Sequence, residues 1–167
     1  MRSKEEHLLD RIREKFDIDG NIQRKRRIWI KIDKDELLEL CGCLKKKGFI
    51  HLSAISVTDW PDDNVFEVTY HIWSYDDKIL ITLKAKLDRE NPTIESVTNI
   101  WQENAQIHER ELHELFGVEF ENNTDLEPLF LEDWSGPPPF RKDFNWREYV
   151  QDEFYDKENE RERVYFY

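Results

Sequence analysis

The chain has 167 residues, a net charge of −12 and 37% charged residues. A chain of this length can bury the core of one domain and still has residues to spare. The acidic balance argues against a nucleic-acid partner and against a lipid-headgroup surface, because both need concentrated positive charge.

The first third of the chain predicts two helices and one strand. A capping-box pattern at Ser3 and Glu6 predicts the start of a short first helix, one face of which carries Leu8, Leu9, Ile12 and Phe16. Alternating isoleucines predict a strand over 28–32. A second helix opens with a capping-box pattern at Asp33 and ends near Gly48.

The middle of the chain predicts an antiparallel sheet. Residues 49–58 are apolar and β-branched enough for a strand, and 61–64 have the composition of a turn. Apolar and polar residues alternate over 66–72 and again over 79–87, which predicts a hairpin. Since one face of this sheet is apolar and the other polar, we expect helices to cover one side only.

A helical region should follow, with Pro92 in its first turn. We expect two pieces, over about 94–101 and 103–116, with Gly117 as a left-handed cap.

Cofactor motifs are missing from the sequence. Cys41 and Cys43 are the only cysteines, whereas a thiolate-bound iron–sulfur cluster or a structural zinc takes about four ligands. Their leucine-rich surroundings favour buried, reduced structural thiols over a redox pair. The glycines form no dinucleotide or phosphate loop. We therefore expect no cofactor and no metal in this chain.

Other features of the whole sequence bear on location. No apolar run approaches the roughly 20 residues that span a bilayer, so we expect no direct membrane span. The charged N-terminal segment lacks the apolar stretch of a secretory signal, which favours a cytoplasmic protein. Abundant lysine and glutamate, with Met1 as the single methionine, resemble the composition of hyperthermophile proteins.

Residues 122–167 differ in character from the rest. They carry six Lys/Arg against twelve Asp/Glu, hence a charge of −6, and hold 11 of the 22 aromatic residues. Disordered tails are poor in aromatic residues, and aromatic side chains are strong interface anchors. We expect an extended arm that docks on a neighbouring subunit. The alternative is that this segment wraps back over its own sheet.

The stretch HERELHELFG, at 108–117, carries the most concentrated charge pattern. On a helical wheel, Glu109 and Glu111 fall on opposite edges of an apolar arc, and Arg110 points away from it. The arc is roughly 100° wide and contains Trp101, Ala105, His108, Leu112, Leu115 and Phe116.

Two catalytic interpretations of this stretch fit poorly. A metal-dependent hydrolase built on His108, Glu109 and His113 would need two histidines four residues apart, and these are five apart. Glu109 and Glu111 flank the helix on opposite sides, so they cannot act on one substrate as paired carboxylates. A contact with a partner chain remains, beside an ordinary solvated helix face.

Residues 109–131, together with 141–144, resemble the signature of the thirty-kilodalton subunit of respiratory complex I. They also resemble its counterparts in membrane-bound energy-converting hydrogenases and related archaeal complexes. The matching elements are Glu109-Arg110-Glu111, Glu114, Phe116-Gly117, Asp125-Leu126 and Arg141-Lys142-Asp143-Phe144.

The sequence also departs from that signature. Glu114 stands where complex I usually has aspartate, and Asn123-Thr124 replaces His-Pro. Gly136, three prolines and Phe140 replace Gly-His-Pro-Leu. The runs LHELFG, at 112–117, and LEDWSGPPPFRKDF, at 131–144, look closer to the hydrogenase-type branch than to the NADH-dehydrogenase branch.

The resemblance implies a non-catalytic, cofactor-free subunit of an ion-pumping oxidoreductase, placed peripherally on the cytoplasmic side of the membrane. It would pack against the large catalytic (forty-nine-kilodalton-type) subunit, near iron–sulfur subunits, and reach the membrane arm through other subunits. Iron–sulfur clusters, and a nickel–iron centre or its evolutionary remnant, would belong to those partners. The alternative is a stand-alone acidic module that binds a basic protein.

The expected fold is a single α+β domain over 1–121, followed by the extended arm over 122–167. Its mixed or antiparallel sheet would have about four strands, with helices mainly on one side. Arg110, framed by Glu109 and Glu111, would be the central contact with the partner, and the basic motif that begins at Arg141 would hold the arm. The expected interface residues are Glu109, Arg110, Glu111, Glu114, Phe116, Gly117, Asp125, Arg141, Lys142, Asp143, Phe144 and Trp146.

Overall fold

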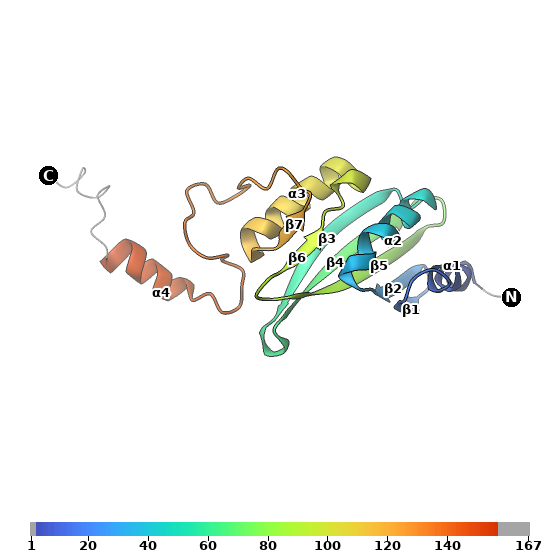
Figure 1. The fold of residues 1–167 in the computed structure, drawn as a ribbon, viewed down its shortest axis with the longest axis horizontal. Helices are drawn as coiled ribbons and strands as arrows, with labels where there is room; N and C mark the ends of the chain where they lie inside the picture. The colour runs from blue at the N-terminus through green and yellow to red at the C-terminus, as the bar shows by residue number, and fades with distance from the viewer. Residues whose placement is uncertain (1–2, 157–167) are drawn as a thin grey trace.

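The computed structural model describes residues 3–156 and confirms a single α+β domain with a mixed sheet (Figure 1). The five-stranded sheet has the order β1-β2-β5-β4-β3, and its neighbours are antiparallel except for the parallel β2–β5 pair. The sheet strands are β1 (Asp19–Arg24), β2 (Arg27–Lys31), β3 (His51–Trp60), β4 (Val65–Ser74) and β5 (Ile79–Asp88). The other elements are α1 (Lys4–Arg13), α2 (Lys34–Lys46), β6 (Thr93–Glu95), α3 (Thr98–Phe116), β7 (Glu119–Glu121), α4 (Trp146–Val150), the 3-10 helix η1 (Pro61–Asp63) and the π-helix η2 (Gln151–Asp156).

The first two helices begin at side-chain caps. Ser3 and Glu6 form the full capping box at α1. Asp33 caps α2 by accepting the N–H of Asp35 at 2.9 Å, so Glu36 is not needed for this cap. Each cap satisfies backbone donors that the helix leaves unpaired.

The core lies on one face of the sheet. Every second residue of β4 and β5 is buried there. The residues between them point to the other face and are at least partly exposed, except for Glu67 and Thr69, which are buried. Helices α1, α2 and α3 all lie on the buried side (Figure 1), as expected from the alternation. The buried residues of β4 and β5 on this face are Phe66, Val68, Tyr70, Ile72, Ser74, Ile79, Ile81, Leu83, Ala85 and Leu87.

Three strands, β1, β6 and β7, were missing from the sequence prediction. Strand β1 is polar and forms the sheet edge, and its Gly20 packs so closely against Leu9 that an added Cβ would lie 2.8 Å from that side chain. Strand β6 occupies 93–95, where we expected helix, because Ile94 is buried and pairs in parallel with Phe120 of β7. The polar composition of β1 and the shortness of β6 hid both from a periodicity search.

Helix α3 breaks where the sequence predicts a break. Gln102 has φ 41° and ψ −119° inside the helix, so two helical pieces meet at this residue. The first piece begins at Thr98, later than expected, because 93–95 is a strand. Gly117 ends the helix in the left-handed conformation, with φ 75° and its N–H 2.9 Å from the His113 carbonyl.

Within residues 3–156, no helix combines the length and the apolar character needed to cross a membrane.

Candidate partner interface

The arm, residues 122–156 as far as the structure describes it, leaves the domain after β7 and runs to α4 (Figure 1). Its first part is held by a stripe on α3. Gln106 donates to the carbonyl of Asp125, and one turn later Arg110 donates to the carbonyls of Glu127 and Pro128, both at 3.0 Å. Residues four apart on a helix lie on the same face, so the stripe continues to Glu114.

Glu114 completes this stripe with an acceptor. Its carboxylate accepts the N–H of Phe130 at 3.0 Å and the N–H of Leu131 at 2.7 Å. Gln106, Arg110 and Glu114 therefore bind only backbone atoms of the arm, and we name them the α3 clamp. Because the clamp binds backbone atoms, it leaves the side chain of Phe130 free to face outward.

The clamp changes the role that we assigned to Arg110. Its side chain does point away from the core, but it binds the arm of the same chain. Glu111 is half-buried and has no hydrogen bond or ion pair with any residue of 3–156.

Glu109 is the clearest departure from the helical wheel. We placed it at the edge of the apolar arc and His108 inside, but Glu109 is fully buried and His108 is only half-buried. The start of the arm and the β6–α3 junction cover this edge of the helix. The Glu109 carboxylate accepts hydrogen bonds from Val97 N–H at 2.8 Å, Ser96 Oγ at 2.7 Å and Asn123 Nδ2 at 2.8 Å.

The wheel failed here because it treats the helix as covered by one flat surface. Burial raises the pKa of the Glu109 carboxyl, and its three hydrogen bonds offset part of that rise. Glu109 thus joins separate segments of this chain, and its side chain is not on the surface.

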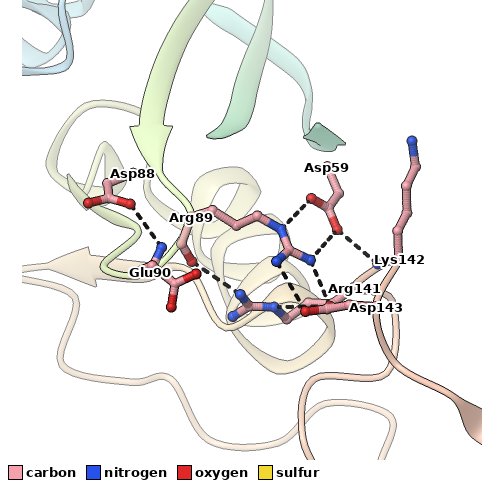
Figure 2. A network of polar contacts seen from close by, with 7 residues as sticks. All are labelled: Asp59, Asp88, Arg89, Glu90, Arg141, Lys142 and Asp143. Atoms are coloured by element: carbon pink, nitrogen blue, oxygen red, sulfur yellow. Dashed lines mark hydrogen bonds and ion pairs between the residues drawn. The ribbon is translucent and has the colours of Figure 1, made fainter. Parts of the chain in front are cut away.

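The second attachment of the arm is an ion-pair network around Arg89 (Figure 2). Arg89 binds Asp59 through two hydrogen bonds, of 2.8 and 3.1 Å, and binds Asp143 of the arm through two more, of 2.6 and 3.1 Å. Asp59 also accepts the backbone N–H of Lys142 at 2.8 Å, and Arg141 donates to the Arg89 carbonyl at 3.2 Å. We name these five residues the Arg89 clasp.

The clasp is buried on the domain side and open on the arm side. The exposed fractions of the side chains are 2% for Asp59, 7% for Arg89 and 58% for Asp143. Burial opposes ionisation of Asp59, but the hydrogen bonds from Arg89 and Lys142 outweigh it and lower the pKa of this carboxyl. The hydrogen bonds from Arg89 also lower the pKa of Asp143. Bidentate pairs of this kind combine strength with fixed geometry.

Aromatic contacts join the end of α3 to the middle of the arm. The ring of Phe116 meets Phe66 of the sheet and Phe140 of the arm edge-on, with centroids 6.1 and 5.8 Å away. An added Cβ at Gly117 would lie 2.9 Å from Pro138, so the arm passes directly over this glycine. The Phe116-Gly117 pair therefore contacts the arm of its own chain.

Beyond this point the arm forms a small aromatic cluster. Trp134, Phe144 and Tyr149 lie with ring centroids 4.8 to 5.9 Å apart, and a Cβ on Gly136 would lie 2.8 Å from two of these rings. The segment thus has a packed centre of its own, which the sequence did not suggest.

Several other large side chains of the arm face outward. They are Phe130, Phe140, Trp146, Phe154 and Tyr155, with exposed fractions between 55 and 75%. Single exposed apolar residues are common on protein surfaces, whereas a concentration on one segment marks an interaction site.

Neither the histidines nor the cysteines form a centre. His113 Nδ1 lies 3.0 Å from the Val118 carbonyl, and no group of three or more metal-binding side chains occurs among the residues described. Cys41 and Cys43 are both free, and burial raises the pKa of the Cys41 thiol.

Sequence reasoning missed Asp59 and Arg89. A signal was present, because both continue the core-facing parity of their strands: Asp59 near the end of β3 and Arg89 just after β5. A charged residue at a core-facing position needs a partner, and the motif at 141–143 supplies it.

Comparisons with known proteins agree with this geometry. Residues 30–150 match the family described as respiratory-chain NADH dehydrogenase, 30 Kd subunit. The chain is 41% identical over 128 residues to the corresponding subunit of F(420)H(2) dehydrogenase from Methanosarcina mazei, covering 75% of this chain and 80% of that protein. It is 37% identical over 114 residues to the corresponding subunit of NADH-quinone oxidoreductase from Moorella thermoacetica, covering 68% and 76%.

Solved structures give the same result. A chain of the membrane-bound sulfane sulfur reductase, an archaeal respiratory membrane complex, superposes with a TM-score of 0.81 at 27% identity, covering 95% of both chains. A trypsin-resistant fragment of Nqo5 superposes with a TM-score of 0.64 at 26% identity, covering 72% of this chain and 98% of the fragment. The protein therefore belongs to the family of the thirty-kilodalton subunit of the respiratory-chain NADH dehydrogenase.

Proposed function

We propose that this chain is a structural subunit, without a cofactor of its own, of the peripheral arm of a membrane-bound, ion-pumping oxidoreductase complex. One observation carries the proposal. The arm is fastened to the domain by the α3 clamp and the Arg89 clasp, yet five of its large aromatic side chains face outward.

This combination fits a preformed docking element. A free arm would lose conformational entropy when it bound a partner, and an arm already fastened to its own domain loses less. The exposed rings then supply the anchors that dominate binding energy at protein interfaces. A stand-alone chain would gain nothing from holding large apolar side chains in water.

The partner that we propose is the large catalytic subunit, on the cytoplasmic side of the membrane, with iron–sulfur subunits near it. Those partners would carry the iron–sulfur clusters and a nickel–iron centre or its remnant. The named relatives support this, because they are subunits of dehydrogenase and oxidoreductase enzymes and of an archaeal respiratory membrane complex.

The twelve residues expected at the interface then divide into two groups. Some can reach a partner directly: Glu111, Asp125, Lys142 and Trp146. The others shape or fasten the surface from inside this chain: Glu109, Arg110, Glu114, Phe116, Gly117, Arg141, Asp143 and Phe144.

Purification from gently solubilised membranes on a tag at Met1, followed by mass spectrometry of the co-purifying chains, tests the proposal. We expect a large catalytic subunit and iron–sulfur subunits. Trp146→Ser should lower their recovery, whereas Ile50→Ser, at a side chain that is 54% exposed on the domain, should not. Recovery of the chain alone from the soluble fraction, with a protease-sensitive arm, would instead favour the stand-alone acidic module.

A further inference from the structure

The face of the sheet opposite the helices has no helix over it within residues 3–156 (Figure 1). We name it the open face. Its side chains come from the positions of β2, β4 and β5 that alternate with the core residues. They are Arg27, Trp29, Lys31, Glu67, Thr69, His71, Trp73, Leu80, Thr82, Lys84 and Lys86.

Strand register gathers positive charge on this face. Lys31 lies directly opposite Lys84 across the parallel β2–β5 pair, and Lys86 follows two residues later on the same side of β5. Like charges on facing positions of neighbouring strands destabilise a sheet. Such local conflicts in an otherwise consistent fold are expected at functional sites.

Only part of this charge is balanced inside the chain. Glu67 forms a salt bridge with Lys84. Glu67 lies opposite Lys86 in the β4–β5 register, but Lys86 forms no salt bridge with a carboxylate among the residues described, and neither do Lys31 and Arg27. The face therefore keeps unpaired cations although the whole chain has a net charge of −12.

Aromatic and histidine side chains on the open face lie close to these cations. The ring of Trp29 lies 4.9 Å from the ammonium of Lys31 and 5.3 Å from that of Lys84. Burial first, and then the charges of Arg27 and Lys84, lower the pKa of His71. The neighbouring imidazole thus experiences a positive field.

A shallow hollow of about 340 Å³ opens among the lysines. Of its three acidic residues, Glu67 is paired with Lys84, Asp33 caps α2, and Asp17 is exposed and forms no salt bridge with the lysines of the hollow. Its lining residues are Asp17, Lys31, Ile32, Asp33, Glu67, Lys84 and Lys86.

We propose that the open face docks a carboxylate-bearing segment of another protein subunit, with an Asp or Glu side chain placed between Lys31 and Lys86. This inference rests on the proposed function, because it needs a multisubunit complex. A partner carboxylate there would form charge-assisted hydrogen bonds with the ammonium groups of Lys31 and Lys86, which form no salt bridge among the residues described. None of the residues that line the hollow belongs to the arm, so the subunit would bind one neighbour through the arm and another through the open face.

Zero-length carbodiimide cross-linking of the intact, purified complex tests the chemistry directly. The reagent joins a lysine amine to a carboxylate as an amide only when the two are already in contact. We expect cross-linked peptides in which Lys31 or Lys86 is joined to an Asp or Glu of another chain. Lys46 and Lys47, on the helical side of the domain, should give no such peptides with the same neighbour.

Charge reversal supplies the second measurement. The double variant Lys31→Glu/Lys86→Glu should lower retention of the cross-linked neighbour by about tenfold or more, since like-charge contacts at an interface cost several kcal/mol. The matched control Lys46→Glu/Lys47→Glu makes the same change in net charge and should retain it. Circular dichroism of the isolated variants checks that both are folded, and we expect wild-type spectra for both.

The outcomes separate this inference from the proposed function. A wild-type chain recovered without any partner subunit overturns both. The open-face site alone is overturned if the complex is complete, no cross-link forms at Lys31 or Lys86, and the Lys31→Glu/Lys86→Glu variant retains its neighbouring subunits as well as the wild type does. A third outcome is that the wild type binds anionic vesicles, the variant does not, and no subunit cross-link forms at the open face. That outcome would assign the open face to a membrane surface and would also overturn the proposed docking of a protein carboxylate there.

Discussion

Glu109 lies where three segments of the chain meet. Its carboxylate accepts hydrogen bonds from the β6–α3 junction and from Asn123 at the start of the arm, and the side chain has no exposed surface. A buried carboxylate is tolerated because its hydrogen bonds replace part of its lost hydration. The residue is therefore a structural connection inside the subunit.

We predict that Glu109→Gln flattens the pH dependence of stability. Burial raises the pKa of this carboxyl above 4.5, so the folded state holds the proton more tightly than the unfolded state does. The contribution of Glu109 to stability is then fully present below the unfolded pKa and is lost as the pH rises through the folded pKa. Urea unfolding of both proteins, followed by tryptophan fluorescence between pH 4 and 8, measures how the free energy of unfolding depends on pH. Equal slopes for the two proteins would contradict the raised pKa.

Arg89 is the other residue on which the attachment of the arm depends. We predict that Arg89→Ala destabilises the protein by about 3–5 kcal/mol, because it leaves the buried Asp59 without its ion-pair partner. Asp143→Asn should cost much less, about 1 kcal/mol, because that side chain is 58% exposed. Chemical denaturation of the two variants side by side gives both values. A smaller loss for Arg89→Ala than for Asp143→Asn would mean that Asp59 does not depend on Arg89.

The ion pair between Asp59 and Arg89 also gives the clasp an acid limit. The pKa of Asp59 is lowered in the fold, so its contribution is present above the ordinary aspartate pKa of 3.8 and is lost as the pH falls through the lowered value. The stabilising contribution of Asp59 is therefore lost as the pH falls, whereas that of Glu109 is lost as the pH rises.

At the scale of elements, α3 organises the arm through three residues spaced one turn apart. Because the α3 clamp holds backbone atoms, it fixes the path of residues 125–131 whatever their side chains are. Phe130 is an example, since its N–H is bound by Glu114 while its ring is 63% exposed.

We predict that Glu114→Gln and Arg110→Ala loosen this segment without unfolding the domain. Hydrogen exchange of the amides of Phe130 and Leu131 should become about tenfold faster in Glu114→Gln, because a neutral amide is a weaker acceptor than a carboxylate. Amides of β4 and β5 should exchange as in the wild type. Assembly with partner subunits should weaken in both variants. A loss of several kcal/mol of global stability in Arg110→Ala would show that this side chain supports the core.

Elements with strong periodicity could be predicted from the sequence. The hairpin of β4 and β5, the capped starts of α1 and α2 and the break near Gln102 follow local rules of alternation, capping and helix interruption. Strand β1 could not be predicted, since its polar residues carry no alternation and only pairing with β2 makes it a strand.

The prediction of the site residues was limited for the same reason, because contacts between distant parts of the chain decide which side chains are buried. The sequence identified the motif at 109–117 and the motif at 141–144, but a helical wheel contains no information about what covers each edge of a helix. Burial of Glu109 depends on Asn123, and the partner of Asp143 is Arg89, which lies 54 residues earlier. Contacts of this range come from the fold and not from local pattern.

At the scale of the whole molecule, the domain and the arm depend on each other unequally. All buried residues of the hydrophobic core lie between Leu9 and Phe120, and Leu126 is the single arm residue packed against that core in the described structure. The arm is held mainly by polar contacts and ring edges. The domain should therefore fold without the arm, whereas the arm needs the domain.

We predict that a chain ending at residue 121 folds with the same sheet but is less stable than the full chain and does not assemble. Removing the arm deprives Glu109 of the Asn123 hydrogen bond and leaves Arg89 with Asp59 alone. Each lost hydrogen bond to a charged group costs about 1.5–3 kcal/mol. The similar Nqo5 structure is itself a trypsin-resistant fragment and covers 72% of this chain.

Circular dichroism, thermal unfolding and co-purification of the shortened chain measure the three parts of this prediction. A matched control keeps the arm but carries Trp146→Ser, which removes an outward ring and leaves the clamp and the clasp in place. The control should lose assembly while keeping wild-type stability, and the shortened chain should lose both. If the shortened chain were unfolded, the boundary at 121 would be wrong, and the arm would be part of the core of the domain.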